Sequence, residues 1–143
     1  MKAKCYIFDI DHTISIPVKR WPYGSCEEDE KIHSIDLLIL ALNVMKRKNP
    51  EAYDIKIIIL SGRKEKDHLR ETQKWLAFNL VWYDELILND TEPCIKGHEF
   101  KKIKLEELKK KYNILGVFDD ELDIHLICTH LWIPSFLFSH NYE

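Results

Sequence analysis

The sequence predicts an α/β fold, a three-layer α/β/α sandwich built around a central parallel sheet. Short runs rich in β-branched residues alternate along the chain with longer amphipathic stretches. Such alternation is typical of βαβ units, whose right-handed crossovers place helices on both faces of a parallel sheet. The length of 143 residues suits one domain, and we expect residues 1–143 to form a single one.

Five short apolar runs are the predicted strands. The clearest of them, IKIIIL, is an almost continuous β-branched run of the kind that is buried on both faces of a sheet. The five runs lie at residues 5–8, 55–60, 86–88, 114–118 and 136–138. Three of these strands end directly in polar residues, at Asp9, Ser61 and Asp119.

Four stretches with apolar residues at three- and four-residue spacing are the predicted helices. They cover residues 34–48, 65–79, 99–112 and 121–130. In the third of them we expect Ile103, Leu105 and Leu108 to face the sheet. Residues 14–31 interrupt the pattern and predict a loop or a small hairpin, whose acidic run at 27–30 we expect to face solvent.

Composition excludes several classes of protein. No run approaches the ~18 apolar residues that a membrane-spanning helix needs, so we expect no membrane partner. The cysteines are spaced too widely for a zinc site or a disulfide framework, which favours reduced thiols in a cytoplasmic protein. They are Cys5, Cys26, Cys94 and Cys128. A net charge of −3 gives no overall electrostatic argument for binding nucleic acid.

The strand ends carry the residues that can do chemistry. In an open parallel sheet, ligands bind outside the carboxyl ends of the strands. Asp9 and Asp11 lie two apart on an extended segment and would point the same way. Together with Asp119 or Asp120 they would form an all-oxygen site, which suits Mg²⁺ and a substrate phosphate. A carboxylate beside the metal can act as a nucleophile, and a second one can act as an acid and base.

These motifs resemble those of the haloacid dehalogenase (HAD) superfamily of phosphatases and phosphotransferases. Residues 9–13, DIDHT, look like its D-x-D-x-T motif, and Ser61 and Asp119-Asp120 fit its second and fourth motifs in order and spacing. The resemblance implies an aspartyl-phosphate mechanism with Asp9 as the nucleophile and Asp11 as the acid and base. It also implies a Mg²⁺ site made by Asp9, the backbone carbonyl of Asp11, and Asp119 or Asp120.

The resemblance further implies a phosphate-binding set and a catalytic lysine. Thr13, Ser61, Gly62 and Arg63 are the expected substrate contacts, since hydroxyls and backbone N–H groups at a helix start bind phosphate oxygens. The family's third motif is a lysine on the helix before the last acidic strand. Lys101, Lys102 and Lys104 compete for this place, and we choose Lys101 because it lies at the predicted start of that helix.

A closer resemblance is to the 3′-phosphatase domains of phage-type polynucleotide kinase-phosphatases. It rests on SGR at 61–63 and TQKWL at 72–76, followed by the strand at 86–88. Those domains usually carry arginine where this chain has Asn89 and Glu121, and the kinase half is absent from this sequence. The short gaps between motifs leave room only for a minimal cap, as in the members of the superfamily that act on polymers.

The leading functional hypothesis is therefore a Mg²⁺-dependent phosphatase for the 3′-phosphate ends of nucleic acid. Trp21 and Tyr23, in the loop after the first strand, could stack on a base of such a substrate. Two alternatives stand beside it. One is the same chemistry on a nucleotide, a sugar phosphate or a phosphoprotein, and the other is a HAD-type fold that binds without catalysing.

Overall fold

A five-stranded parallel sheet forms the centre of the protein in a computed structural model, which describes residues 1–17 and 29–138. The strands lie in the order β5-β4-β1-β6-β7, and all neighbouring pairs are parallel. Their bounds are Ala3–Phe8 for β1, Ile55–Lys64 for β4, Glu85–Asn89 for β5, Tyr112–Asp119 for β6 and Ser135–Leu137 for β7. The predicted parallel sheet is confirmed.

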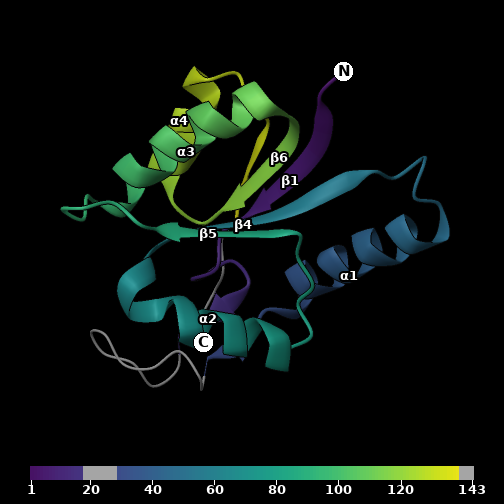
Figure 1. The fold of residues 1–143 in the computed structure, drawn as a ribbon, viewed down its shortest axis with the longest axis horizontal. Helices are drawn as coiled ribbons and strands as arrows, with labels where there is room; N and C mark the ends of the chain where they lie inside the picture. The colour runs from purple at the N-terminus through teal and green to yellow at the C-terminus, as the bar shows by residue number, and fades with distance from the viewer. Residues whose placement is uncertain (18–28, 139–143) are drawn as a thin grey trace.

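Among the described residues, four helices cover the sheet, two on each face (Figure 1). They are α1 (His33–Lys48), α2 (Glu65–Phe78), α3 (Gly97–Lys111) and α4 (Leu122–His130). α1 and α2 lie on one face, and α3 and α4 lie on the other (Figure 1). The predicted three-layer α/β/α sandwich is confirmed. No helix among the described residues is both long and apolar enough to cross a bilayer.

The strand β4 shows how the sheet is buried on both faces. Ile58 and Leu60 point into the core half beneath α3 and α4, whereas Ile57 and Ile59 point into the half above α1 and α2. All four are at most 2% exposed. Burial of such a side chain stabilises the fold by roughly 1.5–3 kcal/mol. The continuous apolar run of the sequence is therefore explained by two separate half-cores.

One of the three residues expected on the buried face of α3 was predicted wrongly. Ile103 was expected to face the sheet, but 45% of its surface is exposed. Leu105 and Leu108 are buried as expected, together with Phe100 and Lys101. At 3.6 residues per turn, Ile103 lies about 200° around the helix from Lys101, so the two cannot face the same way. Lys101, and not Ile103, therefore lies on the side of α3 that faces the sheet.

A small hairpin follows β1 at the carboxyl edge of the sheet. Its strands, β2 (Ser15–Ile16) and β3 (Glu30–Lys31), pair antiparallel, as the sequence allowed. The hairpin's far end, with Trp21 and Tyr23, lies outside the described residues. The acidic run was expected to face solvent, yet Asp29 is buried. Its backbone carbonyl accepts the Trp75 indole N–H at 2.9 Å, which ties this segment to α2.

Candidate phosphoryl-transfer site

The three strand ends marked by polar residues meet at one edge of the sheet. β1 lies between β4 and β6, so Asp9 is flanked by Ser61 on one side and Asp119 on the other. The backbone N–H of Asp9 donates to the carbonyl of Phe118 at 2.9 Å, which extends the β1–β6 ladder by one step. Asp9, Ser61 and Asp119 are all buried. The sheet thus supplies a rigid frame for the polar groups.

A buried lysine joins the two aspartates that end β1 and β6. The Nζ of Lys101 donates to Oδ1 of Asp9 at 2.8 Å and to Oδ2 of Asp119 at 2.7 Å. Of the other candidate lysines, Lys102 is exposed and Lys104 bonds to Glu107 at 3.3 Å. Lys101 is therefore the candidate that the fold carries into the site, one turn from the start of α3.

Burial and charge act in opposite directions on this cluster. Burial raises the pKa of the Asp9 carboxyl well above its usual range; the ammonium of Lys101 works against this and the carboxylate of Asp119 adds to it. Burial alone would lower the pKa of Lys101, but Asp9 and Asp119 together raise it above its usual range. Lys101 is therefore a permanent cation between two carboxyl groups. Its single positive charge is shared between them and cannot fully offset the negative charge of both.

The same edge offers a set of oxygen ligands for a metal. Asp9, Asp119 and Asp120 each bring one carboxylate oxygen within 4.8 Å of the others. Three carboxylates against one ammonium leave surplus negative charge, and hard oxygen donors of this kind are what Mg²⁺ prefers. The donor set therefore fits Mg²⁺. The side chain of Asp11 is not part of this group, and a metal contact through its backbone carbonyl stays a prediction.

Asp11 is held instead by Arg63. Nε of Arg63 donates to Oδ2 of Asp11 at 2.9 Å, and Nη2 donates to Oδ1 at 2.7 Å. This is the two-pronged geometry in which a planar guanidinium matches a carboxylate. Sequence reasoning placed Arg63 among the substrate contacts, and the structure places it beside the expected acid and base. Asp9 and Asp11 thus have separate cationic partners.

The expected phosphate contacts surround Asp9. The hydroxyl of Thr13 donates to Oδ2 of Asp9 at 3.4 Å, and Oγ of Ser61 accepts the backbone N–H of Arg63 at 3.2 Å. Gly62 packs against the first residue of α3, and a Cβ on Gly62 would come within 3.0 Å of the Cα of Gly97. The close approach of these two backbones places the start of α3 beside the end of β4.

Two residues near Arg63 were not predicted from the sequence. The hydroxyl of Thr72 on α2 accepts from Nη1 of Arg63 at 2.9 Å, and the carboxylate of Asp29 lies 3.6 Å from Nη2. Thr72 stands in the TQKWL stretch that carried the resemblance, so a signal existed for it. Asp29 sits in an acidic run, and only tertiary packing distinguishes it from the exposed Glu30.

Comparison with known proteins identifies the family. A family model described as the polynucleotide kinase PNKP phosphatase domain matches residues 3–127, most of the chain. The chain belongs to this family. HAD-type phosphatase activity on nucleic-acid ends is thereby supported at the level of the family. No curated protein matches the chain.

Two solved structures share the fold of this PNKP-type phosphatase domain. One is described as "Structure of the Pnkp1/Rnl/Hen1 RNA repair complex" and the other as "Structure of Pnkp1/Rnl/Hen1 complex". Each matches 94% of this chain at 27% identity with a TM-score of 0.77. The matches cover 42% and 45% of those chains, so this chain spans less than half of their length.

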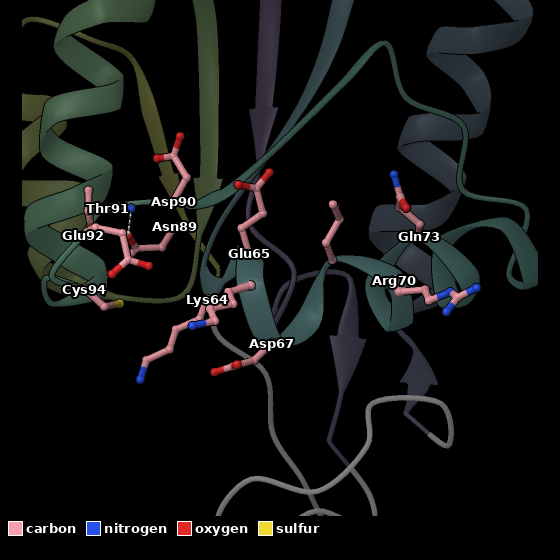
Figure 2. A pocket seen from close by; sticks show the side chains of 12 residues that line it. Lys64, Glu65, Asp67, Arg70, Gln73, Asn89, Asp90, Thr91, Glu92 and Cys94 are labelled. Carbon is pink, nitrogen blue, oxygen red and sulfur yellow. Dashed lines mark hydrogen bonds between the residues drawn. The ribbon is translucent and has the colours of Figure 1, made fainter.

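A groove of about 850 Å³ opens beside the PNKP-type site, between the start of α2 and the loop that follows β5 (Figure 2). Its charged lining is mixed, with three basic and four acidic side chains. These are Lys64, Lys66 and Arg70, and Glu65, Asp67, Asp90 and Glu92. None of the three clustered aspartates lines it. The groove is therefore separate from the cluster of three aspartates.

The loop beside this groove is tied down by Asn89, one of the two positions where the resemblance led us to expect arginine. Its side-chain amide donates to the carbonyl of Ile95 at 2.9 Å, and its Oδ1 accepts the Thr91 hydroxyl at 2.6 Å. Thr91 Oγ1 in turn accepts the backbone N–H of Ile95 at 3.1 Å. Asn89 thus fixes the segment that leads into α3.

Proposed function

We propose that the chain is a Mg²⁺-dependent phosphomonoesterase that works through an aspartyl-phosphate on Asp9. The observation that carries this proposal is the buried bridge from Asp9 through Lys101 to Asp119. A buried carboxylate beside a fixed ammonium is suited to approach a phosphate dianion, because the cation offsets the repulsion between the two negative groups. Burial in the frame of the sheet keeps the attacking oxygen in place.

The reaction follows in two steps from the placement of Asp9 and Asp11. A carboxylate oxygen of Asp9 attacks phosphorus, the bond from phosphorus to the leaving oxygen breaks, and Asp11 gives that oxygen its proton. In the second step Asp11 takes a proton from water, the water oxygen attacks phosphorus, and the bond from phosphorus to Asp9 breaks. Inorganic phosphate leaves, and both carboxyl groups return to their starting state.

The surrounding groups bind and orient the phosphate. Ser61, Thr13 and the backbone at Gly62 are placed to receive the oxygens that do not react, while Lys101 offsets charge. Asp9, Asp119 and Asp120 would hold the Mg²⁺. The metal would supply further charge neutralisation at the phosphate oxygens, which is the main need of phosphoryl transfer.

The leading substrate is a 3′-phosphate end of nucleic acid. Support comes from membership of a family of polynucleotide kinase phosphatase domains, and from two structural relatives in Pnkp1/Rnl/Hen1 complexes, one of which is described as an RNA repair complex. The minimal cap also suits a polymer end, because the described residues between the first two motifs form a small hairpin and one helix. The acidic residues of the groove in Figure 2 argue for a short contact with the strand end and against a long one.

The nucleophile is tested with 4-nitrophenyl phosphate in the presence of Mg²⁺. We expect Asp9→Asn to lower kcat by about 1,000-fold or more, because the amide cannot form the acyl-phosphate. EDTA should abolish turnover by the wild type. The matched control is Asp36→Asn, since Asp36 is paired with Lys31 at 3.0 Å. Turnover by Asp9→Asn at the wild-type rate would refute the assignment.

The substrate is tested by competition among phosphate esters. We expect a higher kcat/KM for an oligonucleotide with a 3′-phosphate than for the same oligonucleotide with a 5′-phosphate or for a 3′-mononucleotide. Equal values for the oligonucleotide and the mononucleotide would favour a small-molecule substrate. Turnover of none of these esters, including 4-nitrophenyl phosphate, would favour the binding protein without catalysis.

A further inference from the structure

The guanidinium of Arg63 is held by three separate parts of the fold. Besides the two bonds to Asp11, Nη1 donates to Thr72 on α2, and Nη2 lies 3.6 Å from Asp29 just before β3. The side chain of Arg63 is only 6% exposed. Thr72 and Asp29 are 0% and 7% exposed. A guanidinium enclosed in this way has little freedom to choose other rotamers.

We propose that Asp29 and Thr72 are positioning residues that fix Arg63, and that Arg63 in turn fixes the direction of the Asp11 carboxyl group. This inference rests on the proposed function, in which Asp11 is the acid and base. Asp29 acts by charge, because 3.6 Å is longer than a hydrogen bond. Thr72 acts by its hydroxyl, which occupies Nη1 and leaves the Nε–Nη2 edge of the guanidinium to Asp11.

The direction of the Asp11 carboxyl group matters because a proton donor must point its proton at the leaving oxygen. With both oxygens accepting from Arg63, the carboxyl group of Asp11 is held in one direction. In the first step one oxygen carries a proton and becomes a donor. Arginine has no acceptor, so that proton must point away from Arg63 while the carboxyl group stays hydrogen-bonded to it. These bonds set where the proton points, and they do so only if Arg63 itself is fixed.

The charges at this edge are divided between two cations. Lys101 forms ion pairs with Asp9 and Asp119, and Arg63 forms ion pairs with Asp11 and Asp29. Asp11 is thereby kept apart from the three clustered aspartates, where a fourth carboxylate would add repulsion. Asp29 supplies Arg63 with a second anion that takes no part in the chemistry. Its contribution is to hold the guanidinium when Asp11 gains its proton and loses its charge.

The inference is tested by the dependence on the leaving group. Asp29→Asn and Thr72→Val keep the side-chain shape and each remove one partner of Arg63. We measure kcat/KM with Mg²⁺ for 4-nitrophenyl phosphate and for phenyl phosphate, whose leaving group needs the proton donor more. We expect each variant to lose about 10-fold on phenyl phosphate and less than about 3-fold on 4-nitrophenyl phosphate. Thr72→Ser keeps the hydroxyl and should restore the wild-type ratio.

Asp36→Asn again serves as the matched control and should leave the ratio unchanged. Equal losses on both esters, or none, in variants that melt like the wild type would overturn the inference and leave the proposed function standing. If Thr72→Val does not fold, the Asp29→Asn result decides by itself. A wild type that hydrolyses neither ester would overturn the proposed function and this inference together.

Discussion

At the scale of single residues, the site depends on where a buried positive charge is placed. Lys101 lies on an otherwise apolar face of α3, among Phe100, Leu105 and Leu108. A buried ion pair stabilises a fold weakly, yet removing one partner leaves an uncompensated buried charge and costs much more. The lysine is thus retained for what it does to Asp9 and Asp119, and its loss should be visible in stability as well as in activity.

We predict that Lys101→Met destabilises the fold in a pH-dependent way. In the wild type, burial raises the pKa of Asp9 while Lys101 holds it down. The variant lacks that restraint, so the folded-state pKa rises further above the unfolded value of about 4. For an acid whose folded pKa is raised, stability is present below the unfolded pKa and is lost as the pH rises through the folded pKa.

The variant should therefore lose about 3 kcal/mol of unfolding free energy at pH 8, and about half of that at pH 5. Urea unfolding in EDTA at the two pH values measures this difference. Lys104→Met is the control, because its partner Glu107 is exposed and surface pairs contribute little. A loss of the same size at both pH values would contradict the assigned cause.

At the scale of elements, the position of Lys101 depends on how closely α3 approaches β4. The contact is made by two glycines, Gly62 two residues before the end of β4 and Gly97 at the start of α3. A Cβ on Gly62 would meet backbone at 3.0 Å, whereas a Cβ on Gly97 would lie at an ordinary 3.5 Å. An alanine at Gly62 would therefore crowd this contact, whereas an alanine at Gly97 would not.

We predict that Gly62→Ala lowers kcat by about 10-fold and that Gly97→Ala changes it by less than about 2-fold. In Gly62→Ala the start of α3 must move by a few tenths of an ångström, and the Nζ of Lys101 moves with it. The loss of unfolding free energy should be about 1 kcal/mol, the low end of the range for overpacking. Kinetics on 4-nitrophenyl phosphate and urea unfolding measure both quantities. Equal effects of the two substitutions would show that this contact does not place the lysine.

The elements were more predictable from sequence than the contacts between them. The polar positions Asp9, Ser61 and Asp119 followed from local pattern, because parallel strands bring their carboxyl ends to one edge whatever the details of packing. The predicted end of the second strand at Ser61 was wrong, since β4 continues to Lys64. The sequence limited the motif lysine to three candidates. Local pattern could not decide among them, since the helical phase of α3 depends on how Phe100 and Leu105 pack into the core.

Contacts between segments far apart in the chain could not be predicted, because no local sequence pattern marks them. Asp29 stands in an acidic run that resembles a solvated face, and only the folded chain brings it to Arg63. The apposition of Gly62 and Gly97 joins residues 35 apart in the sequence, and neither glycine has a positive φ that would reveal a turn. Such pairings are set by the packing of whole elements, which local propensity does not encode.

At the scale of the whole molecule, the two half-cores share one sheet, and this raises the question of whether they unfold together. Cys5 on β1 and Cys128 on α4 both lie in the half-core beneath α3 and α4, and both are fully buried. Burial raises the pKa of the Cys5 thiol to about 12 and that of Cys128 to about 11. Neither thiol is reactive at neutral pH until the structure opens, because the thiolate is the nucleophile. Cys94 is exposed.

We predict that Cys5 and Cys128 are alkylated only through global unfolding. In a Cys26→Ser, Cys94→Ser background, iodoacetamide labelling at pH 7.5 should be slowed about 1,000-fold or more relative to the unfolded chain, as a domain of ordinary stability requires. Mass spectrometry of peptides measures each site, and added urea should raise both rates in parallel. Because β1 is the central strand and α4 packs beside the edge strand β7, faster labelling of Cys128 than of Cys5 would show that the α4–β7 edge opens separately. Equal protection would mean that the strand ends bearing Asp9 and Asp119 belong to one cooperative unit, which is what a site assembled from three strands needs.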